Sequence, residues 1–250
     1  MRLTDSLRTV RGVARSLLIY YGKRQHGAAM QRLYASFVRP GDLVFDAGAH
    51  VGDRVRAFRR LKARVIAIEP QPALVRTLRI LYSADEGVDI EPMALGDRVG
   101  SVELKINIDN PTVSTASDEF VTAARGAPGW DGQAWTRRIT VPMTTLDTLI
   151  MRHGIPRFIK IDVEGFEAQV LAGLSQPVDA LSFEFTTIQR DVALAALDRC
   201  VTLGFSRFDA ALGESQTMVH GVWRSADVIR RWLIDLPDAA NSGDIYAVRR

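Results

Sequence analysis

The sequence predicts an α/β domain with a doubly wound, mostly parallel sheet of about seven strands. Apolar runs alternate with helical patterns, beginning with LVFDAGAHVGDRVRAFRRLKARVIAIE at residues 43–69. The run at 43–45 shows little polar alternation, as expected when helices cover both faces of a sheet. A length of 250 residues and a hydrophobic content of 47% suffice for one large core.

Residues 1–39 form a basic helical extension of a domain that occupies residues 40–250. They contain eight Lys or Arg and one Asp, a net charge of +7, so the remainder carries −4 of the overall +3. Residues 3–21 have apolar side chains at helical spacing, with Arg8, Arg11 and Arg15 largely on the other side. Two interpretations stay open: the helix packs on the domain or on a second copy of the chain, or it docks on an anionic membrane or an acidic partner.

The first loop of the domain has a ligand-binding pattern. Asp46 ends the first strand, and Gly48 and Gly52 flank a turn that lets the backbone approach a ligand at a helix N-terminus. A dinucleotide fingerprint has glycine where this chain has His50, which disfavours a nicotinamide cofactor. Glu69 ends the second strand, where a carboxylate accepts the hydroxyls of a ribose in many nucleoside-binding folds.

The middle of the chain contains a long insertion. After a helix around residues 74–81 and a strand at 88–91 comes the segment with Ala94 and Leu95. Residues 100–106 alternate as a strand with one wet face, and 137–141 are its predicted antiparallel partner in a mixed sheet. Residues 107–136 between them have no clear periodicity. We interpret them as a lid-like insertion that binds an acceptor through Trp130 and Trp135.

A second acidic motif follows the strand at residues 158–162. Asp162 therefore lies at the same sheet edge as Asp46 and Glu69. Burial raises the pKa values of clustered carboxylates unless donors or a cation compensate them. A sulfonium ligand with a free amino group would compensate them, whereas a pyrophosphate would be repelled.

The C-terminal third supplies the remaining elements. We expect strands at 180–185, 205–209 and 244–249, the last as an antiparallel edge strand. Helices are predicted from Thr144 or Thr145 to Gly154, at 191–204 and at 222–236. Cys200 falls on the apolar side of the second of these, where a small buried hydrophobe is favoured over a reactive thiol.

Three motifs together resemble the FkbM family of S-adenosylmethionine-dependent methyltransferases. They are DAGAHVG at 46–52, AIEPQP at 67–72 and KIDVEGFE at 160–167, and the similarity covers about residues 41–184. The resemblance implies a class I methyltransferase, Rossmann-like fold with S-adenosylmethionine as cofactor. It assigns Asp46, Gly48 and Gly52 to the methionine end of the cofactor, with His50 in the same loop where the family usually has Asn. It assigns Glu69 to the ribose, Ala94 and Leu95 to the adenine, and Asp162 to the edge that faces the methyl group.

Four residues are candidates for the catalytic base. Asp162 ranks first, and the others are Glu164, His50 and Lys160. His50 could instead donate a hydrogen bond, Glu164 could compensate a helix dipole, and Lys160 could neutralise the acids. Asp162, Glu164 and Glu184 could bind Mg²⁺ if they faced one cavity, but no HxxxH motif, Cys pair or dense acidic repeat supports a metal, so none is predicted.

The expected function is O-methylation of a hydroxyl on a sugar, a glycan or glycolipid, or a secondary metabolite. A nicotinamide oxidoreductase and a non-catalytic scaffold that retains the fold are the alternatives. The acidic body argues against nucleic acid, which leaves a small-molecule or glycan acceptor as the expected partner, with a homo-oligomer left open. A single cysteine, no signal-peptide core and no apolar run of ~20 residues favour the cytoplasm.

Overall fold

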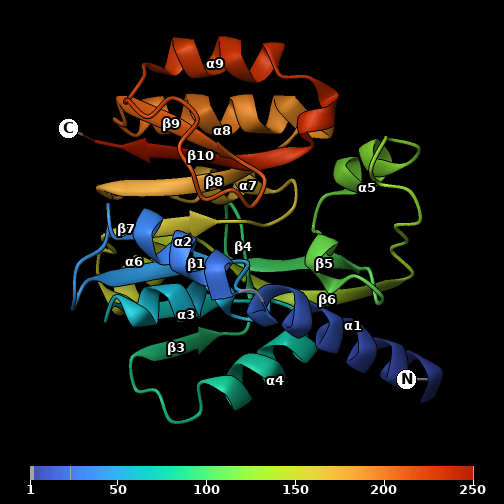
Figure 1. Ribbon diagram of the computed structural model, residues 1–250. Helices are drawn as coiled ribbons and strands as arrows, with labels where there is room; N and C mark the ends of the chain where they lie inside the picture. The colour runs from blue at the N-terminus through green and yellow to red at the C-terminus, as the bar shows by residue number, and fades with distance from the viewer. Residues whose placement is uncertain (1–2, 23, 250) are drawn as a thin grey trace.

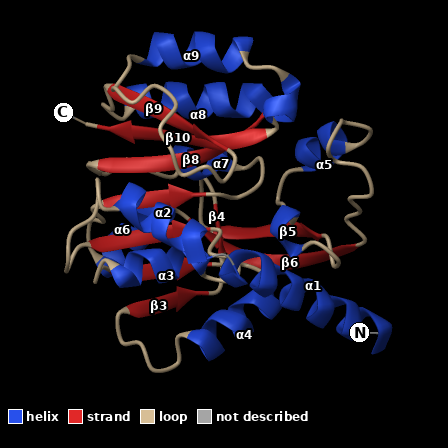
Figure 2. Ribbon diagram, viewed as in Figure 1, coloured by secondary structure: helices blue, strands red, loops and turns tan. Residues whose placement is uncertain are grey.

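A computed structural model describes residues 3–22 and 24–249 (Figures 1 and 2). Its α-helices are α1 (Leu3–Gly22), α2 (Arg24–Tyr34), α3 (Asp53–Arg60), α4 (Pro72–Leu81), α5 (Asp118–Ala124), α6 (Leu146–His153), α7 (Glu167–Ala172), α8 (Arg190–Thr202) and α9 (Ala226–Asp235). Its strands are β1 (Leu43–Ala47), β2 (Arg64–Ile68), β3 (Val88–Glu91), β4 (Ala94–Leu95), β5 (Gly100–Ile106), β6 (Arg137–Thr144), β7 (Phe158–Ile161), β8 (Ala180–Thr186), β9 (Arg207–Leu212) and β10 (Ser242–Val248). Three short 3₁₀ helices are η1 (Pro111–Val113), η2 (Thr187–Gln189) and η3 (Asp238–Ala240).

The main sheet confirms the predicted fold class. Its seven strands lie in the order β3-β2-β1-β7-β8-β10-β9. The first five pair in parallel, and β10 is antiparallel to both of its neighbours. The prediction that the last strand lies at the edge was wrong, because β10 lies between β8 and β9. Residues 243–247 of β10 are buried on both faces, which suits an interior strand.

Alternate residues of the strands pack against helices on opposite faces of this sheet. Phe45 of β1 belongs to a core with α6, α7, α8 and α9, whereas its neighbour Val44 packs with α2 and α3. On β2, Ile66 likewise packs in the first of these cores and Val65 in the second. Cys200 of α8 is buried in the first of these cores, as the helical spacing predicts.

A separate small sheet stands beside the main one. β5 and β6 pair antiparallel from Gly100↔Met143 to Ile106↔Arg137, as predicted. They do not extend the main sheet, however, because β6 pairs on its other side with β4, giving the order β4-β6-β5. This arrangement brings Ala94 and Leu95 against the carboxyl edge of the main sheet.

The insertion at residues 107–136 contains more regular structure than its sequence suggests. It includes η1 and α5, and the side-chain oxygen of Ser117 caps α5 by accepting a hydrogen bond from Phe120 N–H at 2.9 Å. Phe120 and Trp130 pack edge to face, with ring centres 5.1 Å apart, in a small apolar core that also includes Val113 and Ala124.

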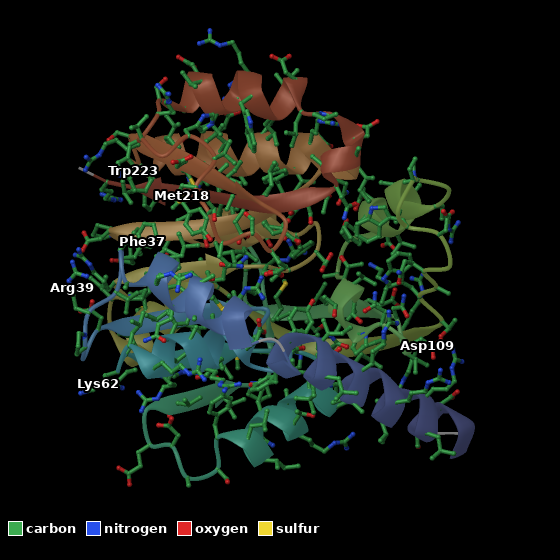
Figure 3. The ribbon with its side chains drawn as sticks, viewed as in Figure 1. Phe37, Arg39, Lys62, Asp109, Met218 and Trp223 are labelled. Atoms are coloured by element: carbon green, nitrogen blue, oxygen red, sulfur yellow. The ribbon has the colours of Figure 1, made fainter. Side chains whose placement is uncertain are left out.

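Helix α1 covers the predicted residues 3–21, but its leucine side does not face the protein. Its buried positions are Gly12 and Ser16, and a Cβ built on Gly12 would lie 2.5 Å from the carbonyl oxygen of Ile108. Arg8 pairs with Asp109, which Figure 3 labels beside this helix. No helix within the described ranges is both long and apolar enough to span a bilayer.

Candidate functional site

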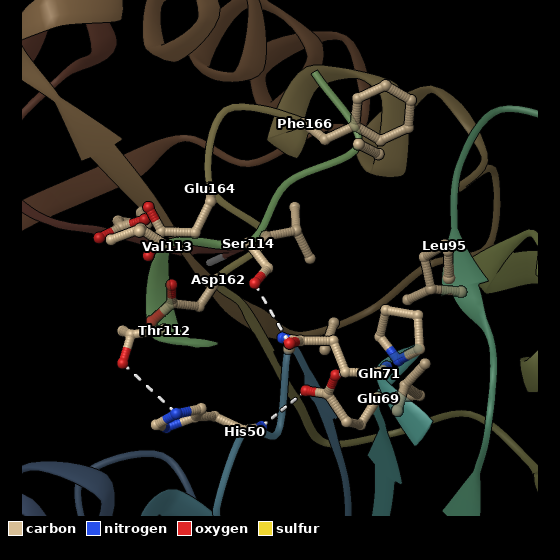
Figure 4. A pocket seen from close by; sticks show the side chains of 18 of the residues that line it. His50, Glu69, Gln71, Leu95, Thr112, Val113, Ser114, Asp162, Glu164 and Phe166 are labelled. Atoms are coloured by element: carbon tan, nitrogen blue, oxygen red, sulfur yellow. Dashed lines mark hydrogen bonds between the residues drawn. The ribbon is translucent and has the colours of Figure 1, made fainter. Parts of the chain in front are cut away.

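The carboxyl ends of β1, β2 and β7 meet beside β4 and the insertion, and a pocket of about 290 Å³ lies there. This volume is close to the lower limit of the ~300–1,000 Å³ typical of small-molecule sites. Seven of the ten predicted site residues line the pocket: Gly48, His50, Glu69, Ala94, Leu95, Asp162 and Glu164 (Figure 4). The other three, Asp46, Gly52 and Lys160, lie behind this lining.

The turn after β1 requires glycine. Gly48 has a φ of +84°, and a Cβ built on it would lie 1.7 Å from the carbonyl oxygen of Asp162. The N–H of Gly48 donates to Ile68 O at 3.0 Å, and the N–H of Asp162 donates to Ala47 O at 2.9 Å. The backbone at the ends of β1, β2 and β7 is therefore packed too closely for a side chain at position 48. Gly52, with a φ of +83°, precedes the first residue of α3.

Glu69 holds the same turn from the side of β2. Its Oε2 accepts a hydrogen bond from the backbone N–H of His50 at 2.9 Å (Figure 4), and its Oε1 accepts one from Gln71 N–H at 2.8 Å. Burial raises the pKa of Glu69 to about 8, although both N–H groups counteract this effect. Each carboxylate oxygen retains a second acceptor site. The geometry is thus compatible with the predicted bonds to ribose hydroxyls.

Asp46 is a buried acid without a hydrogen-bond partner. Its exposed fraction is 0%, and within the described residues neither carboxylate oxygen has a donor. Burial raises the pKa of Asp46 to about 7, Arg54 and Lys160 counteract this, and Asp53 adds to it. An uncompensated carboxylate in this position is costly. A cationic ligand in the adjacent pocket would compensate it.

Asp162 has two cations of its own. Its Oδ2 accepts a hydrogen bond from Lys160 Nζ at 3.1 Å and lies 3.5 Å from the guanidinium of Arg54. Burial alone would raise the pKa of Asp162, but Lys160 and Arg54 outweigh burial and lower it to about 2. Lys160 also donates to Asp244 Oδ1 at 2.7 Å, and the two acids raise its pKa against the effect of burial. A protonated lysine has no lone pair for a proton, which favours the neutralising role of Lys160 over the role of a base.

Three carboxyl groups converge in the pocket. Oxygen atoms of Asp162, Glu164 and Glu184 lie within 4.8 Å of one another. Burial and the charge of Asp162 raise the pKa values of both glutamates well above their usual range. Glu164 has a φ of +56°, and its carbonyl oxygen accepts a hydrogen bond from Thr115 Oγ1 at 2.6 Å, which fixes the turn. The three residues therefore face one cavity. This was the condition under which their carboxylates could bind Mg²⁺.

His50 lines the pocket and contacts the insertion. Its Nε2 is 3.3 Å from Thr112 Oγ1 (Figure 4), and its ring stacks edge-on against Tyr20 with centres 5.3 Å apart. Burial, followed by the charge of Arg54, lowers the pKa of His50 to about 4. The imidazole is therefore neutral at pH 7 and only weakly basic. A hydrogen-bonding role fits this environment better than proton abstraction.

An apolar surface faces the acids. Ala94 and Leu95 of β4 are buried and line the pocket together with Phe166. Trp130 also lines it. Trp135 does not: its Nε1 donates to Val113 O at 2.7 Å, and its ring packs on Phe120.

Arg54 is a site residue that the sequence did not predict. It is the second residue of α3, and its side chain, 12% exposed, forms ion pairs with Asp53 at 3.2 Å, Glu214 at 3.1 Å and Asp162. In the sequence nothing distinguishes it from the other arginines of this helix. Two of its partners, Asp162 and Glu214, lie more than a hundred residues away along the chain, so local spacing does not reveal them. The only sequence signal is its place directly after the glycine turn, at a helix N-terminus.

A model of the methyltransferase FkbM domain matches residues 46–223, more than half of the chain. No curated protein sequence matches the chain significantly.

Several solved structures are similar to the chain at low identity and with TM-scores below 0.5. A TehB-like SAM-dependent methyltransferase from Corynebacterium glutamicum aligns with a TM-score of 0.48 and 11% identity, over 95% of each chain. A precorrin-6y C5,15-methyltransferase from Geobacter metallireducens gives 0.47 and 11%, over 91% of this chain and 89% of that one. Fibrillarin from Aeropyrum pernix, in complex with S-adenosyl-L-methionine, gives 0.42 and 11%, over 85% and 68%. At such identities no residue role transfers from these structures.

Proposed function

The chain belongs to the FkbM methyltransferase family, and from this premise we propose that it methylates a hydroxyl oxygen of a sugar, a glycan or glycolipid, or a secondary metabolite. Its methyl donor is S-adenosylmethionine. Family membership decides against the nicotinamide oxidoreductase. The proposal places the reaction in the cytoplasm, on the basis of the single cysteine.

The residues of the pocket fit this cofactor. The turn at Gly48 has no room for a Cβ, so its backbone can border a ligand directly. Asp46 supplies negative charge when ionised and Glu69 supplies acceptor oxygens, while Ala94 and Leu95 offer an apolar surface for a flat base. When bound, S-adenosylmethionine supplies an electrophilic methyl group on a positively charged sulfur and leaves as S-adenosylhomocysteine. A positive charge there would lower the raised pKa values of the neighbouring carboxyl groups.

One observation carries the O-methyl proposal: Asp162 lies in the pocket beside Glu164 and Glu184 and is paired with Lys160 Nζ at 3.1 Å and with the guanidinium of Arg54 at 3.5 Å. Lys160 and Arg54 keep Asp162 ionised, so it can accept a hydrogen bond from an acceptor hydroxyl and orient its oxygen. Asp162 is a weak base in the ground state, because its pKa is about 2. The acceptor hydroxyl becomes strongly acidic as its oxygen gains positive charge during bond formation, so even this weak base can then take the proton.

Two measurements test the proposal. Calorimetric titration should show binding of S-adenosylhomocysteine and no binding of NAD. Transfer from labelled S-adenosylmethionine to candidate glycans and metabolites should then identify the acceptor, and Asp162→Asn should lower kcat by ~10²–10⁴-fold, the usual contribution of a positioned base. Asp179→Asn is the matched control, because Asp179 is exposed and far from the pocket lining. Full activity of Asp162→Asn would remove this residue from the mechanism.

A further inference from the structure

The outer surface of α1 and α4 is unusually apolar. These two helices lie side by side (Figure 1) and carry six of the fourteen large hydrophobic side chains that are exposed within the described residues. The six are Leu7, Val10, Leu18 and Ile19 of α1, with Ile80 and Leu81 of α4. Leu7, Val10, Leu18 and Ile80 are each at least 67% exposed. We call this surface, with Arg11, Arg15, Arg76 and Arg79, the α1–α4 face.

The cause of this exposure is the way α1 packs. Gly12 and Ser16 are the buried residues of α1, and the approach to Ile108 leaves no space for a Cβ at position 12. A helix that packs through small residues keeps its longer apolar side chains outside. Within the described chain nothing covers them.

The α1–α4 face is also strongly basic. Arg11, Arg15, Arg76 and Arg79 are exposed, and inside the described ranges none of them donates a hydrogen bond or forms an ion pair. The two helices contain five arginines and one acid, Asp5, a net charge of +4. Isolated apolar residues are common on surfaces, but an apolar stripe flanked by unpaired arginines is typical of a helix that lies in a membrane interface.

An apolar groove of about 550 Å³ runs between the two helices. Its lining includes Val13 and Leu17 of α1, Ile80 of α4, Ile106 of β5 with Ile108 just after it, and Ile139 of β6. Arg76 lines the groove as well. An acyl chain would fill such a groove while its phosphate meets the guanidinium.

We propose that the α1–α4 face docks the protein onto an anionic lipid bilayer, with α1 parallel to the membrane plane and an acyl chain in the groove. From Leu7 to Leu18 the apolar stripe extends about 16 Å along the helix. The four exposed arginines of the face oppose its symmetric pairing with a second copy of the chain, whereas an anionic bilayer satisfies both the arginines and the apolar side chains.

The docked orientation would place the candidate site next to the membrane. Gln71 lines both the groove and the pocket, and in the pocket it accepts a hydrogen bond from Ser114 Oγ at 3.2 Å (Figure 4). The closeness of the groove to the pocket favours a lipid-carried hydroxyl among the acceptors named above. This inference rests on the proposed function.

Flotation with vesicles tests the docking surface without any methyl transfer. The full chain should bind vesicles of phosphatidylcholine with phosphatidylglycerol at least ten-fold more strongly than vesicles of phosphatidylcholine alone, and salt should weaken the binding. Each of Arg76→Gln and Arg79→Gln should reduce partition about five-fold, since one arginine near an anionic surface is worth that factor. Leu7→Gln with Leu18→Gln should abolish binding. The matched control is Met151→Gln with Ile155→Gln, which removes two exposed apolar side chains elsewhere and should change nothing.

Three results would overturn the proposal: no vesicle binding, equal binding to both kinds of vesicle, or unchanged binding by the Leu7 and Leu18 double variant. A dimer in light scattering that this double variant dissociates, without vesicle binding, would assign the face to a second copy instead. Titration with S-adenosylhomocysteine on each variant separates these outcomes from a failure of the proposed function, because the α1–α4 face contains no pocket residue.

Discussion

Nζ of Lys160 lies 3.1 Å from Oδ2 of Asp162 and 2.7 Å from Oδ1 of Asp244, so one completely buried ammonium joins the end of β7 to β10. Lys160 is also the register partner of Asp46 across β1 and β7. The ammonium of Lys160 thus neutralises part of the negative charge at the carboxyl edge of the sheet. The chain does not depend on a ligand for the charge of Asp162, whereas it leaves Asp46 uncompensated.

Lys160→Met should therefore destabilise the fold strongly. Removing one partner of a buried ion pair typically costs about 3–5 kcal/mol, because it leaves an uncompensated charge behind. Urea denaturation should measure the loss. Lys62→Met is the control, since Lys62 is exposed, and it should change the free energy of unfolding by less than about 0.5 kcal/mol. A loss below about 1 kcal/mol for Lys160→Met would mean that the network does not hold β7 to β10.

Gly48→Ala tests how closely the backbone packs at the pocket. A Cβ would lie 1.7 Å from the carbonyl oxygen of Asp162, so β1 and β7 must separate to admit it. Gly126→Ala is a matched control, because Gly126 also has a positive φ, +75°, but no atom lies within 4 Å of its Cβ position. The control should lose only the ~1–2 kcal/mol of a left-handed backbone. Gly48→Ala should lose clearly more, together with S-adenosylhomocysteine binding in calorimetry. Equal losses would contradict the close packing.

Asp46→Asn should stabilise the protein without cofactor while weakening cofactor binding. The pKa of Asp46 is about 7 in the fold, against 3.8 without its surroundings, so the native state holds this proton more tightly than the unfolded state does. Because of this difference, the bound proton stabilises the native state in full below pH 3.8. That contribution to the free energy of unfolding is lost as the pH rises to about 7. The shift corresponds to about 4 kcal/mol.

Denaturation curves should consequently show a gain of a few kcal/mol for Asp46→Asn above about pH 7 and none near about pH 4. Affinity for S-adenosylhomocysteine should fall at least ten-fold, because the variant lacks the negative charge behind the pocket. A variant that is destabilised at both pH values would show that the carboxylate has donors in solution.

Trp130 and Trp135 allow a test of the insertion as an acceptor-binding lid. Trp130 lines the pocket, whereas Trp135 is tied to Val113 outside it. Trp130→Leu should therefore raise the KM for the acceptor several-fold with little change in the affinity for S-adenosylhomocysteine. Trp135→Leu should lower the Tm without a selective effect on the acceptor KM. Steady-state kinetics and thermal denaturation separate the two, and a selective KM effect of Trp135→Leu would reverse their roles.

The positions of Asp46, Glu69 and Asp162 followed from sequence alone, because apolar runs define parallel strands and every parallel strand ends at the same edge. The capped helix α5 also left a readable signal: Ser117 followed by Asp118 and Glu119 is a helix start, but the helix has only seven residues and no long apolar period. Which side of α1 faces the protein could not be read, since it depends on the contact of Gly12 with Ile108. The helical spacing of the leucines predicted that their side of α1 would face the protein.

The carboxyl cluster of Asp162, Glu164 and Glu184 gives a prediction about metal removal. Its spacing would suit a divalent cation, but Lys160 and Arg54 already neutralise Asp162, and the raised pKa values of the two glutamates mean that a metal would have to displace their protons. EDTA should leave S-adenosylhomocysteine affinity and methyl transfer unchanged, and millimolar Mg²⁺ should not shift the Tm. A bound cation at one hundred times its Kd would add about 2.7 kcal/mol of stability. A Tm rise that saturates with Mg²⁺ and disappears in Glu184→Gln would establish a metal-assisted site instead.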